Sequence, residues 1–321
     1  MYLSGTVDEG KRGVVVWNSY HNGTKTVTAD ATTSLSRSLT RKVETVSMLR
    51  REVAGWRSRH ETVALVPTMG SLHPGHLALV EEGRRRCRRL VVSIFVNPKQ
   101  FGPNEDFARY PRRIPEDIEK LAAIGVDLVF LPSVDEMFPN GFATTVKVNL
   151  LSDDLCGLSR PSHFPGVATV VTKLLMQCQP DVVLLGEKDY QQLQVVRALV
   201  RDLDIPVTVV AVPTVREPDG LAMSSRNDFL GESERQVATR FAAVLVTVSA
   251  RLTAGEPVLE ALDWGRRELD NLGVNTLEYL ELRDAATLLP VDALRSESRL
   301  LAAVRIGPTR LIDNLLVAPV G

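Results

Sequence analysis

The sequence predicts an α/β fold, with a Rossmann-like parallel sheet that has helices on both faces, followed by a smaller α+β C-terminal domain. Three observations lead to this prediction. Short β-branched runs alternate with amphipathic helical segments between Val43 and Pro213, polar or glycine-containing segments follow these runs, and after Arg216 two long helical stretches precede three more strand-like runs. Alternating strands and helices are typical of a parallel sheet that binds ligands beyond the carboxyl ends of its strands.

The elements are expected in the following order. A helix from Val43 through Trp56 comes first, and then strands alternate with helices. The expected strands are residues 63–68, 90–97, 128–132, 182–186 and 207–213, with helices over 75–89, 116–125, 167–178 and 190–203 between them. Later helices over 232–254 and 258–272 precede strands over 277–282, 300–306 and 310–317.

This pattern divides the chain into three parts. Residues 1–42 are rich in Thr, Ser, Asn and Gly with little apolar periodicity, which predicts a disordered extension. Residues 43–214 are expected to form the Rossmann-like nucleotide-binding domain, and residues 215–321 the smaller C-terminal lid domain. Within the extension, Gly5 to Lys11 reads G-x-x-x-x-G-K, but Arg12 replaces the Ser or Thr of a phosphate loop and no strand precedes it.

Composition excludes several classes of protein. Hydrophobic residues make up 44% and charged residues 24% of the chain, with no apolar run long enough for a membrane span. The sequence has no basic stripe with interleaved aromatic residues, which argues against a nucleic-acid partner. The 3 cysteines lie far apart without a Cys-x-x-Cys pair, which argues against a disulfide framework and a zinc site. We therefore expect a cytoplasmic protein without a membrane or nucleic-acid partner.

The first expected strand leads into a His-x-Gly-His element that opens a helix. His73 and His76 lie three residues apart at the helix N-terminus, with Pro74 in the first turn and Gly75 between the imidazoles. Proline suits this turn because its missing N–H would have no helical partner, and glycine leaves room for a flat base. Imidazole donors beside the positive end of a helix dipole suit phosphate oxygens. Two histidines at this spacing can also be structural, but their position after the first strand favours nucleotide binding.

Polar residues also follow the second and fourth expected strands. Gln100 offers an uncharged donor and acceptor to a hydroxyl or carboxylate, although an ordinary loop glutamine is the alternative. Lys188 follows a buried strand, where a cation requires an anion; that anion is either a phosphate or the carboxylate of Glu187 or Asp189. Gln192, on the next helical turn, is expected to face the same crevice.

The fifth expected strand leads through Gly220 into Met223, Ser224, Ser225 and Arg226. Two hydroxyls and a guanidinium on such a loop can surround a polyphosphate and neutralise charge on a leaving pyrophosphate. Glycine gives the backbone freedom for loop closure. Taken alone, Ser-Ser-Arg is a weak motif and is more typical of a helix cap.

Several segments, in this order, resemble the pantothenate synthetase family of adenylate-forming ligases, within the wider nucleotidyltransferase group marked by His-x-Gly-His and a later Lys-Met-Ser-Lys-Ser-like loop. They are VPTMGSLHPGH, VVSIFVNPKQFGPNEDFARYPR, RPSHFPGVATVV, GEKDYQQL and VPTVREPDGLAMSSRN. The resemblance extends from about Val43 to Ala318. Three residues differ from the family pattern. Lys99 stands before Gln100, where the family usually has an uncharged residue. Glu116 and Lys120 stand where some relatives have Asp and Gln.

The resemblance implies a site for ATP, pantoate and magnesium. ATP would be held by Met69, Gly70, Ser71, Leu72, His73, Pro74, Gly75, His76, Gly186, Glu187, Lys188, Asp189, Val215, Met223, Ser224, Ser225 and Arg226. Of these, His73, His76, Lys188, Ser224, Ser225 and Arg226 are the candidate catalytic residues. Gln100 and Gln192 would bind pantoate. Magnesium would be bound near Tyr110 to Arg112, through ATP phosphates and the carboxylates of Asp117 and Glu116.

The reaction implied by the resemblance condenses pantoate with β-alanine to pantothenate. The pantoate carboxylate attacks the α-phosphate of MgATP, pyrophosphate leaves, and the amine of β-alanine displaces AMP from the pantoyl-adenylate. A homodimer is implied as well. One alternative is a nucleotidyltransferase of the same superfamily that acts on another small substrate, and a second is a non-catalytic nucleotide-binding protein.

Overall fold

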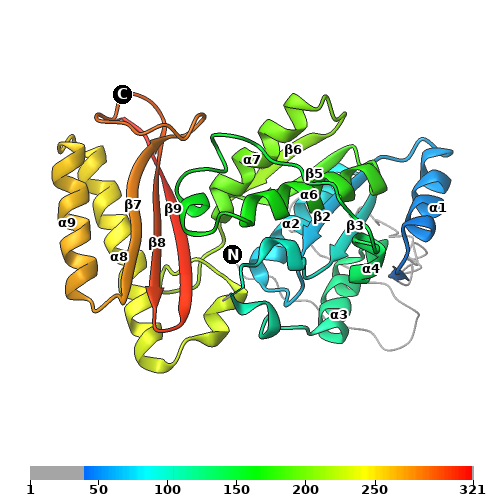
Figure 1. Cartoon of the computed structure of the whole chain (residues 1–321), viewed down its shortest axis with the longest axis horizontal. Coiled ribbons are helices and arrows are strands. Elements are labelled where there is room, and N and C mark those ends of the chain that lie inside the picture. Colours follow the sequence, from blue (N-terminus) through cyan, green and yellow to red (C-terminus); the bar gives the residue numbers. More distant parts are fainter. Residues whose placement is uncertain (1–39, 104, 320–321) are drawn as a thin grey trace, which may run out of the picture. The chain divides into compact units, whose positions relative to one another are not determined.

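A six-stranded parallel sheet with the strand order β1-β4-β3-β2-β5-β6 forms the larger part of the fold (Figure 1). The structure is a computed structural model that describes residues 40–103 and 105–319. The strands are β1 (Arg41–Val43), β2 (Val63–Thr68), β3 (Arg89–Ile94), β4 (Leu128–Phe130), β5 (Val182–Gly186) and β6 (Thr208–Val212).

The order of the strands places a crevice beside β2. From β2 the chain proceeds outward to β3 and β4, and it then returns to the other side of β2 to form β5 and β6. The reversal makes the boundary between β2 and β5 a topological switch point, where the loops that follow the two strands diverge to opposite faces of the sheet. Ligands of open α/β sheets bind beyond the carboxyl ends of the strands at such a point.

Helices cover both faces of this sheet because its strands are apolar on both sides. In β2, Val63 and Leu65 belong to the buried cluster of α1, α6 and α7, whereas Ala64 and Val66 belong to the cluster of α2 and α3. These helices are α1 (Val46–Arg57), α2 (Pro74–Arg86), α3 (Ile114–Ile124), α6 (His163–Cys178) and α7 (Tyr190–Asp202); the short α4 (Val134–Met137) and α5 (Cys156–Ser159) lie between α3 and α6 along the chain. Among the described helices, none is long and apolar enough to cross a membrane.

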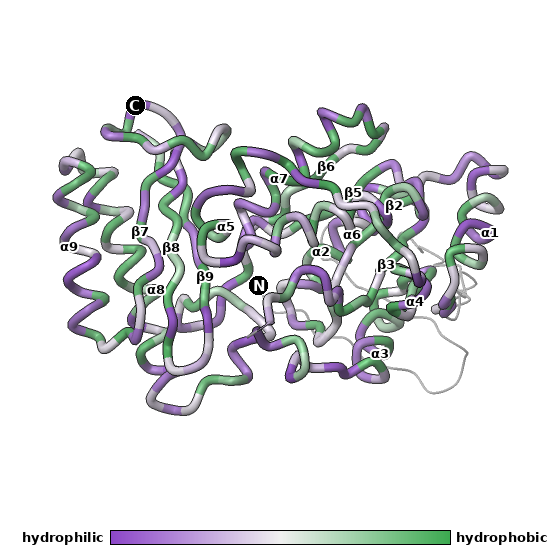
Figure 2. The backbone as a smooth tube through the Cα atoms, viewed as in Figure 1, coloured by the Kyte–Doolittle hydropathy of each residue, from purple (hydrophilic) through white to green (hydrophobic). Residues whose placement is uncertain are grey.

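A second sheet of three antiparallel strands has two helices packed on one face. Leu300, Ala302 and Val304 of its central strand pack with these helices, whereas Leu301 belongs to the buried cluster of the first sheet. In Figure 2 hydrophilic and hydrophobic stretches alternate along the outer helix, α9, as expected for a helix with one face on a core. The elements are α8 (Glu232–Thr253), α9 (Val258–Asn271), β7 (Thr276–Asp284), β8 (Ser298–Ile306) and β9 (Thr309–Val317).

The predicted fold class is confirmed, with one correction at the N-terminal boundary. Val43 does not begin a helix but ends β1, and α1 begins at Val46 with Thr45 as its N-cap. Arg41 and Lys42, expected in the extension, pair instead with β4. Arg41 and Lys42 are exposed, so Val43 is the one apolar residue of this strand and no apolar run marks it, unlike the equally short β4. The other expectations for the extension, including its phosphate-loop-like segment, concern residues 1–39 and lie outside the described residues.

Candidate active site

The carboxyl ends of β2 and β5 open onto a cavity of about 300 Å³. Most of the residues predicted from the sequence line it. From the loops after β2 and β3 come Met69, His73, Gly75, His76 and Gln100; from the segment after β5 come Gly186, Lys188, Asp189 and Gln192; and from the segment after β6 come Val215, Met223, Ser224, Ser225 and Arg226. The predicted residues that do not line the cavity are Gly70, Ser71, Leu72, Pro74 and Glu187.

The two imidazoles lie against each other, with ring centroids 4.0 Å apart. Burial, and then the Lys188 ammonium, lower the pKa of His73 to about 4; burial, and then His73, lower the pKa of His76 to about 3. Both rings are therefore neutral near pH 7. The backbone N–H of His73 donates to Nδ1 of His76 over 3.4 Å, which assigns the proton of His76 to Nε2. The pair can thus donate to an anion without carrying positive charge.

Lys188 lies in the 3-10 turn η3 (Glu187–Asp189), which the second sheet holds in place. The Asn314 side-chain amide of β9 donates to the carbonyl oxygens of Glu187 at 2.8 Å and Lys188 at 2.9 Å. Glu187 pairs with Arg299 at 3.0 Å, so it is not the partner of the Lys188 ammonium. Asp189 Oδ1 lies 3.9 Å from Nζ, which is a loose contact that leaves the ammonium available to an anion.

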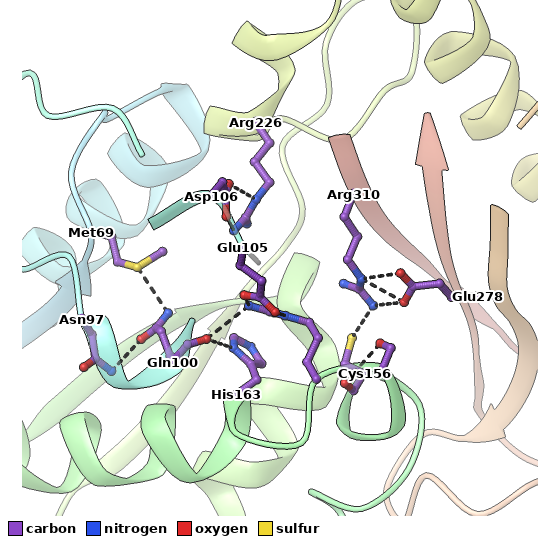
Figure 3. Close-up of polar contacts among 12 residues, drawn as sticks. Met69, Asn97, Gln100, Glu105, Asp106, Cys156, His163, Arg226, Glu278 and Arg310 are labelled. Atoms are coloured by element: carbon purple, nitrogen blue, oxygen red, sulfur yellow. Dashed lines mark hydrogen bonds and ion pairs between the residues drawn. The ribbon is translucent and has the colours of Figure 1, made fainter. Parts of the chain in front are cut away.

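The loop after β6 is tied to the loop after β3 by two side-chain pairs. The Arg226 guanidinium donates to both carboxylate oxygens of Asp106, at 2.9 and 3.1 Å (Figure 3). The hydroxyls of Ser225 and Tyr110 are 3.1 Å apart. Arg226 and Ser225 begin the 3-10 turn η4 (Ser225–Phe229), and Asp106 begins η2 (Asp106–Ala108). Asp106 was not among the predicted site residues, and Tyr110 was named only as part of the stretch near which magnesium would be bound; both lie in a segment that carries the family resemblance.

Gln100 is held from two sides at the end of the 3-10 turn η1 (Pro98–Gln100). Its amide nitrogen donates to Met69 Sδ at 3.2 Å, and its amide oxygen accepts from Asn97 at 3.0 Å (Figure 3). Its backbone carbonyl lies 3.0 Å from His163 Nδ1, and Arg160 donates to the same carbonyl at 3.3 Å. These contacts fix the side chain that was predicted to bind pantoate.

Arg160 is itself paired with Glu105 at 2.6 Å, so its charge is largely neutralised within the loop. Lys99 points elsewhere: its Nζ lies 5.2 Å from the ring centroids of both Phe138 and Phe142, and it is exposed and not among the cavity-lining residues. The ammonium therefore lies outside the predicted acid pocket.

The second sheet contributes a polar wall that sequence reasoning did not find. Cys156 Sγ lies 3.0 Å from the Tyr279 hydroxyl and 3.4 Å from Arg310 Nη2, and Arg310 pairs with Glu278 at 2.9 Å (Figure 3). Cys156, Tyr279 and Arg310 line the cavity. No motif marks these residues, because Cys156 lies more than 100 positions from both Tyr279 and Arg310 and only the folded chain brings them together.

Asp117 and Glu116, which were expected to bind magnesium together with ATP phosphates, lie in two different environments. Asp117 is fully buried, and its two carboxylate oxygens accept hydrogen bonds from the backbone N–H groups of Ser71 and Leu72, both at 2.7 Å. Glu116 is exposed on the same helical turn. Within residues 40–103 and 105–319, no group of at least three His, Cys, Asp or Glu side chains is arranged to hold a metal ion. Both oxygens of Asp117 accept backbone N–H groups, and Asp117 does not line the cavity, so its surroundings fit a structural carboxylate better than a metal ligand.

Comparison with known proteins identifies the family. The family model for pantoate-beta-alanine ligase matches residues 41–316. The chain belongs to this family. The pantothenate synthetase of Paramagnetospirillum magneticum is 53% identical over 277 residues, which cover 86% of this chain and 98% of that protein.

Solved structures of the family agree with the fold. The crystal structure of pantothenate synthetase from Thermus thermophilus is 48% identical, with a TM-score of 0.83 over 87% of this chain and all of that chain (100%). The structure of pantoate-beta-alanine ligase from Francisella tularensis, complexed with beta-gamma ATP and beta-alanine, is 33% identical, with a TM-score of 0.74 over 86% of this chain and 97% of that chain. The strand order and the second antiparallel sheet are thus those of a pantoate-beta-alanine ligase.

Proposed function

We propose that the cavity beyond β2 and β5 binds ATP and pantoate, forms pantoyl-adenylate, and transfers the pantoyl group to β-alanine. Membership of the family makes the chain a pantothenate-forming ligase that uses ATP. What supports this assignment of the site is the convergence of Lys188, the two imidazoles and the Ser225-Arg226 segment on one cavity that Gln100 and Gln192 also line. Cationic and neutral donors suit the phosphates, and two amides suit a small hydroxy acid.

The reaction needs no covalent nucleophile on the protein. A carboxylate oxygen of pantoate attacks the α-phosphorus of ATP, the bond from that phosphorus to the bridging oxygen breaks, and pyrophosphate leaves. The amine nitrogen of β-alanine then attacks the acyl carbon of the adenylate, AMP leaves, and the amine loses a proton. Catalysis would come from aligning the reactants and stabilising charge on the phosphates.

Each polar group has a distinct part in this proposal. Lys188 supplies positive charge to the phosphates, and His76 donates Nε2–H to a phosphate oxygen. Its low pKa makes it a hydrogen-bond donor and a poor proton shuttle, since a general acid or base works best with a pKa near the operating pH. Arg226 would exchange part of its contact with Asp106 for the departing pyrophosphate. Gln100 and Gln192 would orient pantoate.

The division of the chain belongs to the same proposal. Residues 43–214 would bind nucleotide and pantoate, and residues 215–321 would act as the lid that keeps water from the adenylate. Magnesium would enter on the phosphates of ATP as part of the substrate, since the carboxylates expected to bind it do not fit that role. A homodimer and a cytoplasmic location complete the proposal.

An isotope-exchange experiment tests the mechanism. Enzyme given MgATP, labelled pyrophosphate and pantoate, without β-alanine, should transfer label into ATP, and this transfer should require pantoate. Release of ADP and phosphate, or exchange that needs no pantoate, would refute the adenylate mechanism. A nucleotidyltransferase would retain AMP on its product, and a non-catalytic nucleotide-binding protein would show no exchange.

A further inference from the structure

Two residues of the loop between β2 and α2 have a left-handed backbone conformation, and α3 contacts this loop. Gly70 and Ser71 have φ values of +82° and +51°, both in the left-handed region. A Cβ at Gly70 would lie 2.9 Å from Ile94 Cγ2 and 3.1 Å from Asp117 Oδ2, so this position requires glycine for space as well as for conformation. Ser71 is not glycine, and its left-handed conformation requires compensation from neighbouring contacts.

Asp117, at the first turn of α3, supplies that compensation. One carboxylate oxygen accepts the N–H of Ser71 and the other accepts the N–H of Leu72, each at 2.7 Å. Consecutive backbone N–H groups that converge in this way form an anion-binding nest, and here the anion comes from the protein. The carboxylate is fully buried and lies near the N-terminus of α3, whose dipole favours negative charge.

A second residue of the same helix completes the clamp. Lys120, one turn beyond Asp117, donates from Nζ to the carbonyl oxygen of Leu72 at 2.6 Å. The N–H and the C=O of Leu72 are therefore both held by α3, directly before His73. The phosphates of ATP cannot use the N–H groups of Ser71 and Leu72, because these N–H groups already face Asp117.

We infer that Asp117 is a positioning residue that, with Lys120, clamps the β2–α2 loop so that His73 and His76 face the phosphates, and that Asp117 is not a magnesium ligand. This inference rests on the proposed function, which assigns ATP to this cavity. The carboxylate acts through the backbone of the loop and not on the substrate.

Asp117→Asn tests the clamp by replacing one carboxylate oxygen with an NH2 group. An amide accepts with its oxygen only and turns the NH2 group toward the other N–H, so one hydrogen bond is lost and two donors oppose each other. We expect amide hydrogen exchange of peptides containing Ser71 and Leu72 to be at least about tenfold faster, because a charge-assisted hydrogen bond is lost. Glu116→Gln, an exposed change on the same turn, should leave this exchange as in the wild type.

Two further measurements separate a clamp from a metal ligand. In the Asp117→Asn variant, the Kd for ATP in EDTA should rise about tenfold or more, the KM for ATP should rise while the KM for pantoate stays constant, and excess Mg²⁺ or Mn²⁺ should not restore activity. Normal ATP binding in EDTA combined with rescue by high Mg²⁺ would overturn the inference. Lys120→Met is the second variant, for use if Asp117→Asn does not fold. It removes only the contact to Leu72, so it should show the same changes to a smaller extent. Unchanged hydrogen exchange of the loop amides in Lys120→Met would also overturn the clamp. A wild-type chain that binds no ATP would count against the proposed function. Hydrogen exchange of the loop amides in the variants would still show whether Asp117 and Lys120 hold the loop.

Discussion

Replacing Lys188 with Ala should abolish most of the activity and leave the stability almost unchanged. The Lys188 side chain is 19% exposed, and its carboxylate contact is the 3.9 Å approach of Asp189, whose own side chain is 48% exposed. An ion pair that is this loose and this accessible to solvent contributes only about 0 to 1 kcal/mol to folding. The change in the free energy of unfolding should therefore be below about 1 kcal/mol.

The expected loss of activity is much larger than this. The η3 turn is fixed by Asn314, so the ammonium is held in place before substrate arrives, and a preorganised group that faces developing phosphate charge contributes about 2.7 to 4 kcal/mol. Since about 1.4 kcal/mol corresponds to a factor of ten, kcat/KM for ATP should fall about 10²-fold or more. For Lys188→Ala, the expected loss of transition-state stabilisation is therefore several times larger than the expected loss in the free energy of unfolding.

Steady-state kinetics and urea unfolding of the same preparation measure both quantities. Lys99→Ala is the matched control, because Lys99 is also a lysine near the site but lies outside the cavity. This control should keep its kcat/KM. A Lys188→Ala variant that is nearly as active as the wild type but clearly less stable would refute the reasoning and make Lys188 a structural ion-pair residue.

Three other predictions concern the acid pocket, the histidines and the N-terminal extension. Lys99→Met should change the KM for pantoate less than about fivefold, because an exposed ammonium contributes at most about 1 kcal/mol, and a larger rise would place this charge in the pocket. The pKa values of His73 and His76 in the folded chain, about 4 and about 3, lie below the usual 6.5, so below pH 6.5 the unfolded chain binds protons that the folded chain does not. The free energy of unfolding should therefore fall as the pH is lowered from 7 toward 4, by up to about 1.4 kcal/mol per pH unit for each histidine. Urea unfolding of His73→Gln should show a smaller decrease over the same pH range. Equal decreases in the wild type and the variant would contradict the burial of this ring as a neutral group. Removing the residues before Thr40 should leave kcat/KM within a few-fold, because that segment lacks the apolar periodicity needed to pack on a core, and a hundredfold loss in a folded truncation would assign it to the site.

The fold was predictable because its strands are buried on both faces and therefore appear as short apolar runs. β2 and β5 begin and end at the predicted residues. The topological rule for parallel sheets then places the segments after these strands together, which is why the two histidines and Lys188 were expected to meet. β1 was missed because Val43 is its one apolar residue, so no apolar run marks it.

The partners of the site residues could not be predicted from local patterns. Arg226 and Asp106 are 120 positions apart, and Asn314 lies 126 positions from Lys188. Neither pair has a spacing or composition that marks it. Asp117 illustrates a second limit, since a buried carboxylate that accepts two N–H groups and one that binds a cation are the same residue type. Only the positions of the donors distinguish the two roles.

In the proposed mechanism, the distribution of charge around the cavity would favour the transition state over bound ATP. Four of the five arginines that line it pair with carboxylates, Arg226 with Asp106, Arg160 with Glu105, and both Arg305 and Arg310 with Glu278, whereas the Arg109 guanidinium lies 5.7 Å from the centroid of the Phe229 ring. The histidines are neutral, whereas Lys188 is a cavity-lining cation whose contact with a carboxylate is as long as 3.9 Å. Because phosphates would have to compete with Asp106 for Arg226, the gain from that contact would be smaller for bound ATP than for a pyrophosphate group that acquires charge as it departs. An interaction that strengthens only along the reaction raises kcat without tightening the ground state.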